Sequence, residues 1–187
     1  MIFPFLCLLA INNKALLNIA NNLKANQDKI FEANKMDLEL AKPFVENGEL
    51  SQSVFNRLKL DENKMRDMIQ GIIDISNLED PIGKTLLKRQ LDDGLILTKI
   101  SCPIGVLGII FEARPNVASD AFGLCLKAGS AVILRGGKEA LRSNMATIGI
   151  FRDTLKEMGL DENLVQIVED TSHETAEKMM RLNGFID

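Results

Sequence analysis

Apolar and polar residues alternate with the period of a helix in the first third of the chain. Between Asn12 and about Leu40, leucine, isoleucine and alanine recur every three or four residues, with lysine, asparagine and aspartate between them. This spacing predicts a long amphipathic helix, in one piece or two. Further helices are expected over about 51–57 and from behind Asp61, a predicted N-cap, to Ile75. A helical segment therefore precedes the first predicted strand.

Two runs with strand-like alternation, LLKRQL and LILTKI, flank Asp92-Asp93-Gly94. An Asp-Gly pair supplies the positive φ that a tight turn needs, so residues 85–101 are predicted to form a β-hairpin that projects from the rest of the chain. A lone two-stranded ribbon is only marginally stable in water. The hairpin is therefore expected to pack on another surface, and the alternative is that it folds back on its own domain.

The second half of the chain alternates apolar runs with helical patterns. The runs at 106–111 and 131–134 are continuous, as in parallel strands that are covered on both faces, and a helix is predicted between them over 117–127. A helix over 139–158 with a Gly159 stop, a short buried strand over 164–168 and a helix over 172–181 follow. The last helix has Thr171 or Ser172 as its cap. This β-α-β-α-β-α order predicts an α/β fold with a parallel, Rossmann-like sheet.

Ligands of open parallel sheets bind beyond the carboxyl ends of the strands, which points to two loops, 112–116 and 135–139. In the second loop, Gly136 and Gly137 let a ligand approach the backbone, while Arg135 and Lys138 bring two positive charges to the strand end. Arginine binds phosphate by paired hydrogen bonds and lysine as a point charge, which favours a ribose 2′-phosphate and hence NADPH over NADH. The alternative is a Gly-Gly turn with solvated basic residues.

The loop after the first predicted strand places Glu112, Arg114 and Asn116 within one turn, and Pro115 suits the start of the next helix. Such a density of polar groups is compatible with a substrate site. An alternative without chemistry is that Asn116 caps the helix and Arg114 pairs with Glu112.

Composition excludes several classes of protein. The 187 residues are 46% hydrophobic with a net charge of −4 and neither Trp nor Tyr, which argues against nucleic-acid binding. Three cysteines at wide spacing and one histidine support neither a disulfide framework nor a metal site, and fit a reducing cytoplasm. The apolar opening MIFPFLCLLAI is too short for a membrane span and has no basic region, so it is not interpreted as a signal peptide. It is either the inward face of a shortened first helix or a consequence of where the reading frame begins.

Other reactive side chains are expected to have structural roles. Cys125 lies in an apolar helical pattern and Cys102 precedes a proline at a strand start, so both are expected to be inert. His173 has no nucleophile motif beside it, and the pairs Glu79-Asp80 and Asp92-Asp93 are expected to face water in turns. No G-x-G-x-x-G follows any predicted strand, so the usual dinucleotide fingerprint is absent from the sequence.

The words PIGVLGIIFEARPN and LCLKAGSAVILRGGKEA, and more weakly DPIG and FID, resemble the γ-glutamyl phosphate reductases (glutamate-5-semialdehyde dehydrogenases) of the aldehyde dehydrogenase superfamily. The resemblance runs from about Asn12 to Asp187. It implies NADPH-dependent reduction of γ-glutamyl phosphate to the semialdehyde in proline biosynthesis, in the cytoplasm, through a cysteine thiol that forms a thiohemiacetal or thioester. That superfamily also lacks the glycine fingerprint and holds the adenosine half of its cofactor with side chains at a strand end.

The resemblance also implies roles for individual residues. Arg135, Gly136, Gly137 and Lys138 would bind NADPH, Asn116 would donate to the oxyanion, and Arg114 would meet the acyl phosphate. The nucleophilic cysteine is expected beyond Asp187, no metal is expected, and the sheet is expected to be incomplete at the C-terminus. The chain by itself would therefore lack activity.

The resemblance further implies an organisation of the chain and several partners. Residues 1–83 would form a helical segment, 84–101 an oligomerisation hairpin and 102–187 a partial NADPH-binding domain. A homo-oligomer through the hairpin is expected, with glutamate 5-kinase as a further candidate partner. The alternatives are a non-catalytic nucleotide-binding or oligomerisation module, the reductase part of a bifunctional pyrroline-5-carboxylate synthase, or another acyl-phosphate or aldehyde-oxidising relative.

Overall fold

The N-terminal helical pattern forms two helices, α1 (Phe3–Ala25) and α2 (Gln27–Glu46). The computed structural model describes the backbone of residues 3–187 and the side chains of residues 11–187, so the proposed inward face of the first ten residues lies outside the described side chains. Helices α3 (Gln52–Leu58) and α4 (Glu62–Asn77) follow. The Asp61 side chain accepts a hydrogen bond from the backbone N–H of Lys64, which confirms the predicted cap of α4.

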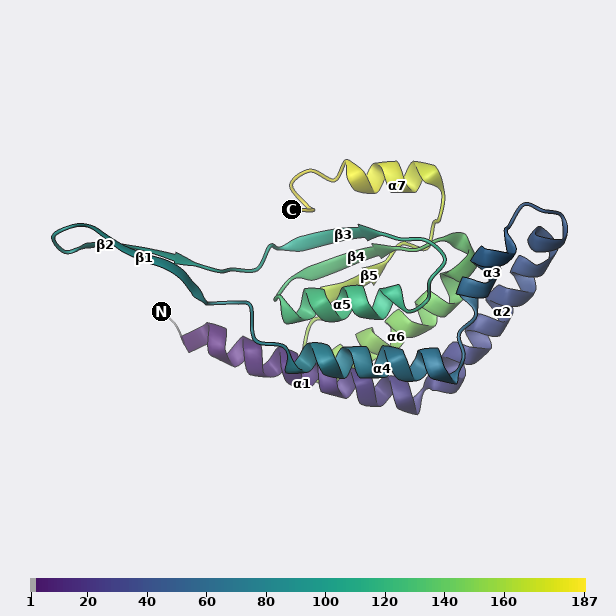
Figure 1. Ribbon diagram of the computed structural model, residues 1–187, viewed down its shortest axis with the longest axis horizontal. Coiled ribbons are helices and arrows are strands. Elements are labelled where there is room, and N and C mark those ends of the chain that lie inside the picture. The colour runs from purple at the N-terminus through teal and green to yellow at the C-terminus, as the bar shows by residue number, and fades with distance from the viewer. Residues whose placement is uncertain (1–2) are drawn as a thin grey trace.

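A parallel sheet of three strands, in the order β3-β4-β5, occupies the second half of the chain. Figure 1 shows α5 and α6 on the same side of this sheet as α1 and α4, with α7 on the opposite side. The α/β fold with a parallel sheet and a helical N-terminus is confirmed. The elements are β3 (Val106–Ile110), α5 (Val117–Lys127), β4 (Ala131–Arg135), η1 (Lys138–Ala140), α6 (Leu141–Glu157), η2 (Glu162–Leu164), β5 (Val165–Ile167) and α7 (His173–Met180).

The main hydrophobic core joins the N-terminal helices to the sheet. Its buried members come from α1, α2, α4, α5, α6, β4 and β5 and from Leu60 before α4, and within it the rings of Phe122 and Phe151 stack with centroids 5.2 Å apart. Leu16, Ile19, Met68 and Ile72 pack into the same cluster from the N-terminal side. The helical stripes and the strands therefore bury their apolar faces against each other rather than in separate cores.

Strand β3 is less buried than its continuous apolar sequence predicted. Ile110 is 44% exposed, and no residue of β3 is fully buried. The prediction of a fully buried strand is wrong for β3, because β3 is an outer strand with a neighbouring strand on one side only. On the face opposite α5, helix α7 and the C-terminal residues press against it, and a Cβ on Gly108 would lie only 2.9 Å from the Met179 side chain. The Asp187 N–H donates to the Val106 carbonyl at the outer edge of β3.

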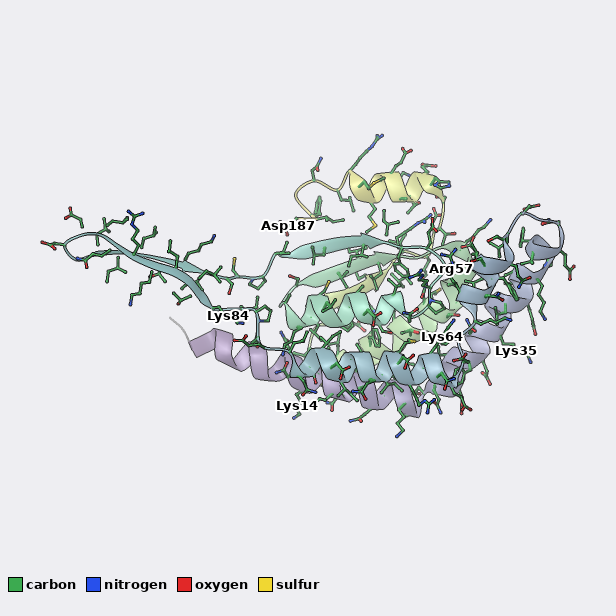
Figure 2. The ribbon with its side chains drawn as sticks, in the orientation of Figure 1. Lys14, Lys35, Arg57, Lys64, Lys84 and Asp187 are labelled. Carbon is green, nitrogen blue, oxygen red and sulfur yellow. The ribbon has the colours of Figure 1, made fainter. Side chains whose placement is uncertain are left out.

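The predicted hairpin is present and projects far from the body of the molecule. Strands β1 (Thr85–Asp92) and β2 (Leu95–Ile100) pair in antiparallel register, and Gly94 takes a φ of 77° in the turn. Every residue of both strands is exposed, and Figure 2 shows side chains standing free on both faces. The exposed apolar side chains are Leu86, Leu87, Leu91, Leu95, Ile96, Leu97 and Ile100. The alternative in which the hairpin folds back on its own domain is wrong.

Helix α2 is tied to the start of α6 by buried polar groups. The Asp37 carboxylate, 1% exposed, accepts hydrogen bonds from the Ser143 N–H and hydroxyl at 2.8 and 2.7 Å, and from the Arg142 N–H at 3.3 Å. The Asn34 amide donates to the Leu58 carbonyl and the Ser143 hydroxyl, and accepts from the Leu60 N–H. These bonds fix α2, α3 and α6 relative to one another.

Two searches of the described residues were negative. No helix there has the length and apolar content that a membrane crossing requires. Within the same part of the chain, no three His, Cys, Asp or Glu side chains are grouped so as to hold a metal ion.

Replacement of Asp37 by Ala is expected to lower the free energy of unfolding by about 2 to 4 kcal/mol, because it leaves the Ser143 and Arg142 N–H groups buried without an acceptor. Urea unfolding followed by circular dichroism measures the loss. Glu39→Ala, an exposed change on the same helix, is the control and is expected to cost less than about 0.5 kcal/mol. Equal effects of the two substitutions would show that the tie between α2 and α6 contributes nothing.

Candidate functional site

The two strand-end loops lie side by side. The Phe111 N–H donates to the Arg135 carbonyl at 3.0 Å, just where β3 and β4 end. A Cβ placed on Gly137 would lie 3.6 Å from the backbone nitrogen of Ala113. The loops 112–116 and 135–139 therefore form one continuous edge at the carboxyl ends of the strands, as expected for a ligand crevice.

Gly136 occupies a place where no side chain fits. A Cβ there would lie 2.5 Å from Asn144 Nδ2 and 3.3 Å from the Phe111 ring. The Asn144 side chain is fully buried, and neither its oxygen nor its nitrogen has a hydrogen-bond partner among the residues that the structure describes. The Nε of Arg135 is likewise buried and unpartnered. Buried polar atoms are rarely left unpaired, so these atoms mark the Gly-Gly turn as a functional candidate.

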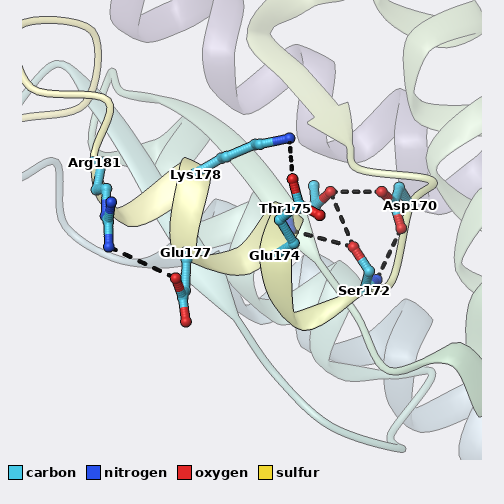
Figure 3. A network of polar contacts seen from close by, with 7 residues as sticks. All are labelled: Asp170, Ser172, Glu174, Thr175, Glu177, Lys178 and Arg181. Atoms are coloured by element: carbon cyan, nitrogen blue, oxygen red, sulfur yellow. Dashed lines mark hydrogen bonds and ion pairs between the residues drawn. The ribbon is translucent and has the colours of Figure 1, made fainter.

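Arg135 reaches from the end of β4 to the segment that leads into α7. Its guanidinium donates to the carbonyls of Thr171 and Ser172. Figure 3 shows the polar network at this point, in which Asp170 accepts from the Ser172 N–H and the Thr175 hydroxyl. The hydrogen bond from the Thr175 side chain, followed by that from the Ser172 backbone, lowers the pKa of Asp170 from its usual value. Arg135 thus braces α7 against the sheet.

Lys138 leaves the turn in a different direction, toward α2. Its ammonium lies 5.4 Å from the centroid of the Phe44 ring, within cation–π range. It borders a hollow of about 200 Å³ between the C-terminal half of α2, the following loop and the start of α6. We call this the α2 hollow. Its side chains include Leu40, Phe44, Leu50, Lys138, Glu139 and Arg142. The structure therefore does not bring the side chains of Arg135 and Lys138 to one point.

Asn116 stands immediately before α5, but its side chain makes no capping hydrogen bond. It lines a second hollow of about 200 Å³ with Asp120 and, from α4, Lys64 and Asp67. Burial raises the pKa of the Asp120 carboxyl, and a hydrogen bond from the Asn116 side chain partly opposes that rise. Asn116 therefore lies beside Asp120 at the start of α5, and its side chain does not cap the helix.

The other reactive side chains singled out in the sequence show no site-like arrangement. Arg114 is exposed, and among the described side chains it forms no ion pair with Glu112, so the predicted alternative of such a pair is wrong. Burial raises the pKa of the Cys125 thiol, which keeps it protonated and inert as expected. Cys102 and His173 are exposed. Cys102 precedes β3, at the opposite end of that strand from the loop 112–116, and His173 is the first residue of α7.

Sequence reasoning missed the polar residues that border the site, namely Asn34, Asp37, Arg142 and Asn144. A signal for two of them was present. Ile30, Asn34, Asp37 and Ala41 follow one another at intervals of four, three and four residues, so the two polar side chains lie on the buried stripe of α2. Polar residues on an apolar stripe indicate a buried partner. Which partner they have depends on α6, more than 100 residues away.

Gly136→Ala is expected to destabilise the chain by about 1 to 3 kcal/mol, because the new methyl group collides with the buried Asn144 amide and the Phe111 ring. Gly149→Ala is the matched control. It lies inside α6 with open space around its Cβ position, so it is expected to stabilise by about 0.5 to 1 kcal/mol. Thermal unfolding of the two variants beside the wild type measures both changes. If Gly136→Ala matched Gly149→Ala, the tight fit around the turn would be disproved.

Comparisons with known proteins extend over nearly all of the chain. No protein-family model matches it. The γ-glutamyl phosphate reductase of Brachyspira hyodysenteriae is 48% identical over 178 residues, which are 95% of this chain and 41% of that protein. The corresponding enzyme of Clostridium perfringens is 47% identical over 175 residues, 94% of this chain and 41% of its own length. The chain thus spans about two fifths of the length of the curated relatives it matches.

The solved structures that resemble this chain include a γ-glutamyl phosphate reductase as well. The γ-glutamyl phosphate reductase of Thermotoga maritima superposes with a TM-score of 0.88 at 36% identity, covering 94% of this chain and 41% of that one. The glyceraldehyde-3-phosphate dehydrogenase of Methanocaldococcus jannaschii, complexed with NADP, covers 96% of this chain and 35% of its own, with a TM-score of 0.60 at 12% identity. The latter likeness shows the fold alone. Over 94% or more of its length, the chain is therefore a homologue of the γ-glutamyl phosphate reductases, in an aldehyde dehydrogenase-type fold, and corresponds to about two fifths of such an enzyme.

Proposed function

We propose that this chain acts in the NADPH-dependent reduction of L-γ-glutamyl 5-phosphate to L-glutamate 5-semialdehyde, as the part of the enzyme that binds the dinucleotide. The observation that carries the proposal is the 48% identity over 95% of the chain to a γ-glutamyl phosphate reductase. In the overall reaction, the acyl phosphate takes up a hydride and a proton, the C–O bond to phosphate breaks, and inorganic phosphate leaves. The step belongs to proline biosynthesis, and we place it in the cytoplasm.

The turn formed by Arg135, Gly136, Gly137 and Lys138 would hold NADPH, which supplies a hydride when bound. The residues present fit this ligand. Gly136 and Gly137 leave the backbone of the turn without side chains, and the ammonium of Lys138 faces the adjoining hollow. Arg135 holds the loop before α7 at the same edge of the sheet, which keeps the crevice in shape.

Asn116 would donate its side-chain amide to the oxygen on which negative charge develops when the carbonyl is attacked. A donor of this kind stabilises the transition state only if its orientation is set beforehand. The place of Asn116 supports that role, because it follows β3 at the carboxyl edge of the sheet and its side chain makes no capping hydrogen bond. Arg114, which is exposed on the same loop, would meet the phosphate of the substrate.

The nucleophilic cysteine of the reaction is proposed to lie outside these 187 residues. Cys125 is buried with a raised pKa, and Cys102 is remote from the strand ends. The 187 residues alone are therefore expected to bind nucleotide without turnover. The hairpin is proposed to form a homo-oligomer, since its apolar side chains lie open on both faces.

A hybrid enzyme tests the proposed reaction. In the hybrid, this chain replaces the matching 41% of the Brachyspira hyodysenteriae enzyme. Activity is measured by absorbance as the phosphate-dependent oxidation of glutamate 5-semialdehyde with NADP. The hybrid is expected to be active, and Asn116→Leu in the hybrid to lower kcat by about 10²- to 10³-fold. Asn21→Leu, an exposed change on α1, is the control and should leave kcat unchanged. A soluble, folded hybrid without activity, or equal effects of the two substitutions, would contradict the proposal.

The proposed oligomer predicts that the purified chain has at least twice the mass of a monomer. Leu97→Lys on the hairpin is expected to shift it to the 20.7 kDa monomer, because a buried ammonium would be desolvated at the interface. Leu124→Lys, on an α5 leucine of similar exposure, is the control and should leave the mass unchanged. Light scattering after size exclusion measures the mass. A wild-type chain that stays monomeric at micromolar concentration would rule out the hairpin as an interface.

A further inference from the structure

The hollow beside Asn116 lies between α4 and the start of α5. Lys64, Asp67 and Met68 line it from α4, and Asn116 and Asp120 line it from the start of α5. We call it the α4–α5 hollow. Figure 1 shows the two helices side by side, both beginning at the carboxyl end of the parallel sheet. The hollow therefore lies at the edge of the sheet where ligands of such folds bind.

The two carboxylates of the α4–α5 hollow have no cationic partner in the described part of the chain. Among the side chains of residues 11–187, neither Asp67 nor Asp120 forms an ion pair. Asp120 reaches across to α4, where its Oδ1 lies 3.5 Å from the position of a Cβ on Gly71, one helix turn beyond Asp67. Burial raises the pKa of the Asp120 carboxyl, a cost that a bound cation would offset. The lining therefore favours a ligand with a positive charge.

Lys64 does not neutralise these carboxylates. Its ammonium donates to the backbone carbonyls of Lys59 and Arg57, at the end of α3. An ammonium has three N–H donors, so one of them remains for a ligand. The hollow thus offers two carboxylates as acceptors and one free donor of Lys64. Such a lining fits a group that carries both a positive and a negative charge, as the α-amino acid end of a glutamyl compound does.

The spacing of Asn116 and Asp120 matches the length of a glutamyl group. The Asp120 N–H donates to the Asn116 carbonyl at 3.3 Å, so the two residues lie one helix turn apart on the same face of α5. In γ-glutamyl phosphate, two methylene groups separate the α-carbon from the reacting carbonyl carbon. The ammonium and the carbonyl oxygen of the extended molecule are therefore about 5 Å apart, roughly one helix turn. A substrate whose carbonyl meets Asn116 can thus place its ammonium against Asp120.

We propose that the α4–α5 hollow binds the α-amino acid end of the γ-glutamyl substrate, with Asp120 and Asp67 as the acceptors for its ammonium and Lys64 as a donor to its carboxylate. This inference rests on the proposed function and makes Asp120 a residue that selects substrates with a free α-amino group. At about 200 Å³ the hollow is smaller than the clefts of roughly 300 to 1,000 Å³ that enclose small molecules completely. Its size therefore agrees with one end of the substrate rather than the whole.

NMR titration of the 187-residue chain tests the contact. The probes are L-glutamate 5-methyl ester and glutarate monomethyl ester, which differ by the α-ammonium alone. The wild-type chain is expected to bind the glutamate ester about tenfold more tightly, with shifted amide signals over residues 116–120. Asp120→Asn should reduce this preference to less than about twofold, because a carboxamide carries no charge, and Asp67→Asn should act in the same direction. Asp153→Asn, an exposed change on α6, is the control and should keep the preference.

The hybrid enzyme gives a second readout, with glutamate 5-semialdehyde and 5-oxopentanoate, which lacks the ammonium, as the two aldehydes. Asp120→Asn is expected to lower kcat/KM for the semialdehyde about tenfold, mainly through KM, and for 5-oxopentanoate less than twofold. Asp153→Asn should change neither value.

The outcomes separate this inference from the proposed function. An active hybrid in which Asp120→Asn keeps the ratio of the two aldehydes would overturn the role of the α4–α5 hollow alone. A chain that binds both esters equally, or neither, would do the same, as would equal losses for both esters in Asp120→Asn. A hybrid without activity contradicts the proposed function, whereas a preference for the glutamate ester that depends on Asp120 would still support a site for the α-amino acid group.

Discussion

The buried carboxylate of Asp37 is the interaction on which the site depends. It holds the first turn of α6 against α2 through the Ser143 N–H, the Ser143 hydroxyl and the Arg142 N–H. A carboxylate this far from water is stable only while its acceptor sites are filled, so the tie also sets where α6 begins. The start of α6 in turn places η1 and the Gly-Gly turn. The α2 hollow lies between α2, η1 and the start of α6, and the hydrogen bonds of Asp37 hold α2 against α6 beside it.

The positive side chains at the carboxyl edge of the sheet point to different sides of the Gly-Gly turn. Arg135 is used to hold the segment before α7, while Lys138 and Arg142 face the hollow on the other side of the turn. An arginine that braces backbone carbonyls cannot also wrap a phosphate, because its planar fork of donors is already committed. The Asn144 amide, which has no hydrogen-bond partner among the described side chains, lies against Gly136, and the Nε of the neighbouring Arg135 is likewise without one. Such unsatisfied groups are costly, and their position beside the turn is consistent with a site shaped for a ligand.

The hairpin and β3 share one physical feature, which is apolar surface that no described side chain of residues 11–187 covers. Leu95, Ile96 and Leu97 are about half exposed on the ribbon, and Ile110 is 44% exposed on the outer strand. A two-stranded ribbon has no interior, so burial of these side chains requires another surface. For β3, the sequence carried the pattern of a fully covered strand, but it lies at the edge of a sheet of three strands. The chain spans about two fifths of the length of the relatives it matches.

Local patterns were enough to determine the order of elements. The periodicities, the Asp61 cap and the Asp-Gly turn located the helices, the hairpin and the parallel strands, because each of these depends on residues close together in the chain. The same is true of the two strand-end loops, since a parallel sheet puts all its carboxyl ends at one edge. Tertiary structure alone decided that Asn34 and Asp37 meet Ser143, that Arg135 turns to α7 and that Lys138 shares a hollow with Arg142. The direction of a long polar side chain is set by the partners within its reach, and these come from elements about 35 to 110 residues away, whose packing no local pattern encodes.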